Sequence, residues 1–212
     1  MSEGTGDLSV TRREFIWATL ATAVVPPLLP GWGGGAHASM SQNGVGWSGW
    51  VLYDALSPEA GVFARAAHQG RARLRAVGTD VTPVMTDLAA AWSTQAVPVC
   101  GLTRDSSWMI LEQLARAHGI EPSFLGVHEY LPEGAVRHHL TGAHAEELST
   151  GLASAGARWA EELGAQAKLL FQGGLAHAGI PCATTVFGKA ERPSASPGYF
   201  VSWALVPRGL AR

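Results

Sequence analysis

The segment from Gly101 to Ser107 combines residues that hold anions at a point where a strand leads into a helix. It contains the hydroxyl groups of Thr103, Ser106 and Ser107 and the guanidinium of Arg104. Together with unpaired backbone N–H groups of a helix N-terminus, these groups can hold a carboxylate or a phosphate. The alternative is that Thr103 or Ser106 only caps the helix while Arg104 is solvated. No G-x-G-x-x-G or P-loop sequence is present, so a dinucleotide or nucleoside triphosphate is not expected.

Two aspartates, Asp54 and Asp80, each end a predicted strand. Carboxylates in that position can hold Mg²⁺ or act as general base or nucleophile. Alternatively, each binds the first N–H groups of its own turn, as aspartate does routinely. Both residues are therefore candidates for a ligand site.

Histidines gather around a predicted β-hairpin, and they offer a metal site as a further possibility. His138 and His139 are adjacent on one strand and point to opposite faces, so they cannot both bind one ion. His128 could meet His139, or His138, across the hairpin, with Glu129 nearby. Two imidazoles and a carboxylate can bind a transition metal, but the spacing matches no specific zinc motif. The alternative is histidines that are hydrogen-bonded or at the surface.

The two cysteines, Cys100 and Cys182, leave two possibilities open. In an oxidising compartment they could form a disulfide, which requires their Cα atoms to lie within roughly 7 Å. Otherwise they are two small apolar side chains. Cys100 is also a candidate nucleophile.

Strands and helices of moderate length alternate over the stretch that carries most of these residues. This alternation predicts an α/β fold, a three-layer sandwich with a mostly parallel sheet between helices. Ser57-Pro58 and Thr82-Pro83 mark two helix starts. The expected strands are 50–54, 73–77, 97–102 and 124–128, and the expected helices are 58–69, 83–92 and one that ends at His118.

The second strand carries Arg71, Arg73 and Arg75 on one face, which suits the edge of a sheet, whereas the third strand is apolar throughout. The flavodoxin-like order 2-1-3-4 is our preference, and a Rossmann order is the alternative. Ligands of such sheets bind at the carboxyl ends of the strands, where the winding direction switches. Asp54 would then face the 101–107 loop.

The rest of the chain extends this sheet. Turn residues at 131–134 predict that the strand 136–140 returns antiparallel to the fourth strand. A helical segment follows over 145–171, where glycines bend or split it. Two late strands are expected at 182–187 and 199–206, separated by a proline-containing loop.

The N-terminus has the features of an export signal. Thr11-Arg-Arg-Glu-Phe-Ile16 precedes a short apolar run to Pro30, and Ala36-His-Ala38 follows. Prolines interrupt the apolar run, which is too short for a membrane span. The segment resembles the leader of the bacterial twin-arginine pathway. Trp17 departs from that pattern, since a lysine is frequent there.

This resemblance implies a bacterial protein that is exported folded by the twin-arginine translocation machinery and works in the periplasm, with no stable membrane span once the leader is cleaved after Ala38. Its domains would be a leader (1–38), a tether (39–49) and one α/β domain (50–212). An uncleaved leader acting as an anchor is the alternative. A formal net charge of −2 gives no reason to expect a nucleic acid as partner.

Three functions are compatible with these residues. The preferred one is a non-catalytic protein that binds a small anionic ligand at the strand ends or serves as accessory subunit of an exported redox enzyme. The alternative is a small hydrolase, isomerase or transferase that uses Asp54, Asp80, Cys100 or His128. A metal-binding protein that uses the hairpin histidines is the third. No cofactor is identified.

Overall fold

The structure is a computed structural model that describes residues 48–68, 72–173, 175, 181–187 and 192–208. The predicted leader, the tether as far as residue 47 and Arg71 lie outside the described residues. So does the first part of the predicted loop between the two late strands.

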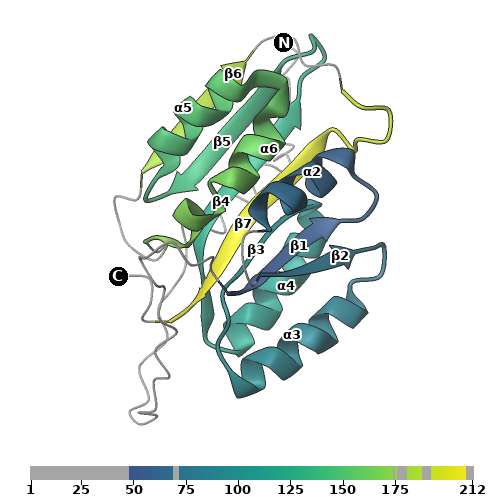
Figure 1. Ribbon diagram of the computed structural model, residues 1–212, viewed down its shortest axis with the longest axis vertical. Helices are drawn as coiled ribbons and strands as arrows, with labels where there is room; N and C mark the ends of the chain where they lie inside the picture. The colour runs from purple at the N-terminus through teal and green to yellow at the C-terminus, as the bar shows by residue number, and fades with distance from the viewer. Residues whose placement is uncertain (1–47, 69–71, 174, 176–180, 188–191, 209–212) are drawn as a thin grey trace, which may run out of the picture. The chain divides into compact units, whose positions relative to one another are not determined.

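The described residues form one sheet of seven strands in the order β2-β1-β3-β7-β4-β5-β6 (Figure 1). Helices pack on both faces of the sheet, so the predicted α/β sandwich is confirmed. The strands are β1 (Trp50–Asp54), β2 (Arg73–Val77), β3 (Val99–Thr103), β4 (Ile120–Tyr130), β5 (Val136–Gly142), β6 (Cys182–Phe187) and β7 (Tyr199–Pro207).

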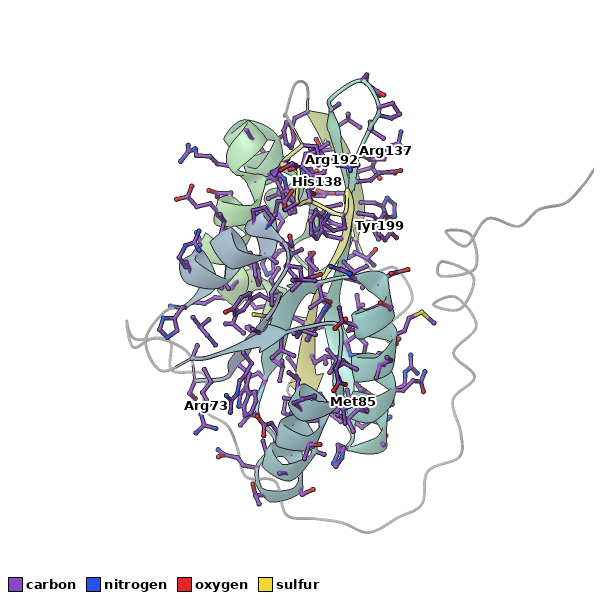
Figure 2. The ribbon with its side chains drawn as sticks, turned by 90° about the vertical axis from the view of Figure 1, so that its right-hand side faces the viewer. Arg73, Met85, Arg137, His138, Arg192 and Tyr199 are labelled. Carbon is purple, nitrogen blue, oxygen red and sulfur yellow. The ribbon has the colours of Figure 1, made fainter. Side chains whose placement is uncertain are left out.

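The described helices divide between the two faces. Helices α2, α5 and α6 lie on one face, and α3 and α4 lie on the other (Figures 1 and 2). Their bounds, with those of two 3-10 helices, are α2 (Pro58–Ala67), α3 (Thr82–Thr94), α4 (Asp105–Ala117), α5 (Ala145–Ala155), η1 (Gly156–Arg158), α6 (Trp159–Ala165) and η2 (Ala167–Phe171).

The strand order confirms the 2-1-3 part of the prediction and corrects the rest. β1 pairs in parallel with β2 and β3, but β7 lies between β3 and β4 and is antiparallel to both. β4 therefore keeps the predicted direction without being the neighbour of β3. The reason lies in β7 itself, whose residues after Tyr199 are all buried. A strand that is apolar on both faces is most stable inside a sheet.

The placement of the edge strand is confirmed. β2 pairs with β1 alone among the described strands, and β3 is fully buried. The guanidinium carbons of Arg73 and Arg75 lie 5.5 and 5.6 Å from the ring centre of Trp50. Arg75 also pairs with Asp87 of α3 at 3.0 Å. The charged face of β2 therefore covers a tryptophan and binds a helix instead of facing only water.

The hairpin and the split helical segment are also as predicted. β4 and β5 pair antiparallel, and His128 lies opposite His138. The helical segment breaks at Gly156, whose φ of +58° favours glycine. At Gly164, a Cβ atom would meet the carbonyl oxygen of Phe63 and lie 3.1 Å from the backbone nitrogen of Ala67. A glycine at this position allows α6 to pack closely on α2.

Candidate functional site

Asp54 and Arg104 meet at the carboxyl ends of β1 and β3, as predicted from the expected strand order. Arg104 Nε donates to Asp54 Oδ2 at 2.6 Å, and the backbone N–H of Leu56 donates to Asp54 Oδ1 at 2.8 Å. The Asp54 side chain is 7% exposed and that of Arg104 is 40% exposed. The anion next to this guanidinium is therefore a carboxylate of the protein itself.

Of the other residues predicted for the anion site, Thr103 has a structural partner. Thr103 is buried, and its hydroxyl accepts a hydrogen bond from Trp203 Nε1 at 3.0 Å. Asp105 Oδ1 accepts from the backbone N–H of Ser106 at 2.8 Å, so this carboxylate occupies part of the first turn of α4. Ser107 is half-buried within that turn. The geometry thus places the polar groups together, but Asp54 and Asp105 already accept hydrogen bonds there that an anion would need.

Asp80 takes the turn role that was the alternative for it. Its Oδ1 accepts from the backbone N–H of Thr82 at 2.9 Å, at the start of α3. Hydrogen bonds from the side chain and backbone of Thr82 lower the pKa of Asp80. The residue is exposed and stabilises the beginning of a helix.

A buried polar network occupies the face of the sheet beneath α6. His128 Nδ1 lies 2.6 Å from His138 Nδ1, and His128 Nε2 lies 2.7 Å from Ser202 Oγ. Both histidines and the serine are fully buried. Trp159 stacks on His128 with 4.6 Å between ring centres. Ser202, His128 and His138 are hydrogen-bonded in the order of the nucleophile, base and orienting group of an acyl-transfer enzyme. All three side chains are buried, so a substrate cannot reach them.

Burial keeps both of these histidines neutral. It lowers the pKa of His128 well below its usual value, and the neighbouring His138 lowers it further. Burial alone lowers the pKa of His138 to about 3. In the part of the chain that the structure describes, His138 Nε2 has no hydrogen-bond partner. Protonation of either ring would therefore introduce a charge with no compensating carboxylate beside it.

A second polar group lies at the start of α2. Ser57 Oγ donates to Glu59 Oε2 at 3.0 Å, while Glu59 Oε1 is buried without a hydrogen-bond partner among the described residues. Burial raises the pKa of Tyr130 to about 12; a hydrogen bond with Trp159 opposes this shift, Glu59 adds to it, and the charge of Arg192 opposes it. These side chains therefore adjoin the histidine network near the carboxyl end of β4.

Of the histidines considered as metal ligands, His128 meets His138 but not His139. His128 points toward α6, and the pairing of β4 with β5 sends His139 to the opposite face. Glu129 lies 3.7 Å from Arg137 in an ion pair. No group of three or more metal-binding side chains occurs within the described ranges. His128, Glu129 and His139 therefore cannot bind one ion together.

Both cysteines are free, and only one of them is accessible. Cys100 is fully buried in β3, and burial raises its pKa, so it is not an available nucleophile. Cys182 is exposed at the start of β6, and its Sγ lies 3.2 Å from His139 Nε2. His139 Nδ1 lies 2.6 Å from Thr184 Oγ1. The contact between the Cys182 thiol and His139 depends on the register of β5 with β6, which the sequence pattern did not predict.

Cys182, His139 and Thr184 lie on a part of the sheet that none of the described helices covers, and this part is called the open face below. In Figure 2, Arg137 and Tyr199 point away from α5 and α6, and α4 covers only the part of the sheet below them. Side chains alternate along strands, so the register assigns further residues to this surface. The open face consists of Val127, Glu129, Arg137, His139, Thr141, Cys182, Thr184, Val186 and Tyr199.

A comparison of the chain with protein-family models, curated proteins and solved structures finds no match. Among the helices that the structure describes, none is long and apolar enough to cross a membrane.

Proposed function

We propose that this protein is exported through the twin-arginine pathway and acts without catalysis, as an accessory subunit that binds an exported partner protein. The observation that carries the proposal is the open face of the sheet. Val186 is 52% exposed there, on the edge strand β6. The half-buried Val127 and Tyr199 lie further in on the same face, and Arg137 and Glu129 separate Val186 from Tyr199. Exposed apolar and aromatic side chains interspersed with polar and charged ones occur in protein interfaces.

The positions of the predicted catalytic groups support a binding role over the enzymatic alternative. Asp54 is paired with Arg104, and Asp80 binds its own turn. Cys100 and His128 are fully buried. No carboxylate or thiol contacts His128 in the described structure, since its ring nitrogens bond His138 and Ser202. These residues do not form a catalytic group.

The partner interface can be tested by placing a charge on the open face. Val186→Arg is expected to weaken partner binding by at least about tenfold, because a buried interface position rarely tolerates an unpaired charge. Met109→Arg on α4, where the side chain is 49% exposed, is the matched control. The partner is co-purified with the wild-type chain, identified, and titrated against both purified variants. Equal affinity of the two variants would contradict the assignment of this face.

The export route has a separate test. Replacing Arg12 and Arg13 by lysine is expected to stop export, because the resemblance rests on that pair. The chain should then accumulate in the cytoplasm with its leader intact, as measured by fractionation and by the mass of the protein. The unaltered chain, expected to begin at Ser39 after cleavage, is the control. Unchanged export of the double variant would exclude the twin-arginine route.

A small anionic ligand at the strand ends is the second candidate. One observation favours it, namely the 40% exposure of the Arg104 side chain beside the N-terminus of α4. An incoming anion would have to compete with Asp54 for the guanidinium and approach Asp105. Both carboxylates oppose it, so the geometry supports this candidate less well than partner binding.

A further inference from the structure

Cys182 is exposed, and a neighbouring base lies in position to take its proton. Its Sγ lies 3.2 Å from His139 Nε2 across the β5–β6 pair. Thr141 Oγ1, directly opposite Cys182, lies 3.9 Å from the same sulfur. A thiol reacts as its thiolate, so a neighbouring proton acceptor decides whether a cysteine is reactive.

Thr184 orients that base. Its Oγ1 lies 2.6 Å from His139 Nδ1, and the tautomer with the proton on Nδ1 donates to this oxygen. Nε2 then presents its lone pair to the thiol of Cys182. Partial burial lowers the pKa of His139, so the imidazole is neutral at neutral pH. The Cys182 thiol thus contacts the His139 imidazole, which in turn contacts the Thr184 hydroxyl, and all three groups lie on the open face.

No disulfide within the described chain can form at this thiol. Cys100 lies on β3, four strand positions from β6, which corresponds to roughly 19 Å at the usual strand spacing. It also faces the buried core on the opposite side of the sheet. A disulfide requires Cα atoms within roughly 7 Å. Any sulfur that bonds Cys182 must therefore come from outside this chain.

We propose that Cys182 is a thiol–disulfide exchange site that takes a low-molecular-weight disulfide, with His139 as proton acceptor and Thr184 as positioning residue. The thiol proton passes to His139 Nε2, and the thiolate attacks one sulfur of the incoming disulfide. A bond forms between that sulfur and Cys182 Sγ as the original disulfide bond breaks. The departing thiolate takes the proton from His139. One disulfide replaces another, so no further oxidant is needed.

The test uses oxidised glutathione as the probe and the mass of the intact protein as the readout. The wild-type chain is expected to gain one glutathione, and Cys182→Ser none. His139→Gln should slow the reaction by about 100-fold at neutral pH, the lower range for a positioned general base. Thr184→Val should slow it by a smaller factor, and Thr184→Ser should restore it by supplying a hydroxyl again. His144→Gln, at a half-buried histidine that contacts Glu147, is the matched control.

Two results would overturn the proposal. One is a rate for His139→Gln within about twofold of the wild type, with the same circular dichroism spectrum. The other is an adduct that forms equally in Cys182→Ser. Val186→Arg alters neither the Cys182 thiol nor the His139 imidazole. If this variant loses partner binding but still gains glutathione at the normal rate, the exchange site and the partner interface are independent.

Discussion

Acidification from pH 6.5 to pH 4.5 is expected to destabilise the protein by on the order of 1 kcal/mol per pH unit for each of His128 and His138. The unfolded chain binds protons at these residues near pH 6.5, whereas the folded pKa of His138 is about 3 and that of His128 is well below 6.5. The unfolded state therefore holds more protons throughout this window. The folded state therefore has its full stability with respect to these two histidines above pH 6.5, and it loses that stability as the pH falls toward 3.

Urea denaturation at a series of pH values measures this slope. His138→Leu should reduce it, because one buried titrating group is removed. Ser202→Ala is the matched control, since it breaks the contact with His128 Nε2 but retains both imidazoles. That variant should lower the urea midpoint at every pH and leave the slope in place. A wild-type midpoint that stays constant between pH 6.5 and pH 4.5 would show that these rings are not buried as neutral groups.

Trp159→Ala is expected to lower the free energy of unfolding by about 3–5 kcal/mol, the usual cost of truncating a buried tryptophan. The side chain is fully buried and stacks on His128, with Phe200 at 6.0 Å between ring centres. Its loss leaves a cavity between α6 and the sheet and gives water access to the histidine network. Urea denaturation at pH 7 measures the effect.

Trp159→Phe is the control for this prediction. It keeps an aromatic ring over His128 and removes the indole N–H, so the expected cost is below about 1.5 kcal/mol. The acid sensitivity of the two variants should also differ. Trp159→Ala should have a shallower pH slope than the wild type, because hydration reduces the penalty for charging the rings. A cost of less than 1 kcal/mol for Trp159→Ala would contradict the close packing at this position.

Features that depend on residues close together in the sequence were predictable. Ser57 accepts from the backbone N–H of Ala60 at 3.3 Å, as expected of a helix cap before Pro58. The second helix start is also correct, but its mechanism differs. No side chain caps the helix from its N-cap position, and Asp80 binds the N–H of Thr82 instead. Asp54 and Arg104 meet because strand direction alone brings the carboxyl ends of β1 and β3 together.

Features that depend on pairing between distant segments were not predictable in this way. The apolar pattern of β7 suits any central position, and the choice between β3 and β4 as neighbours arises only on assembly of the sheet. The contact of His139 with Cys182 likewise requires the register of β5 with β6. A shift of one residue would turn either side chain to the other face. Alternation along each strand was visible in the sequence, but the register was not.

The position of β7 has a consequence for biosynthesis. While a ribosome is still producing residues 199–207, β3 and β4 have been made but the strand that separates them has not. A nascent chain at that stage carries two unpaired inner edges, which are prone to aggregation. Among the described strands, β7 alone joins these two edges, so the sheet cannot close before residues 199–207 have emerged.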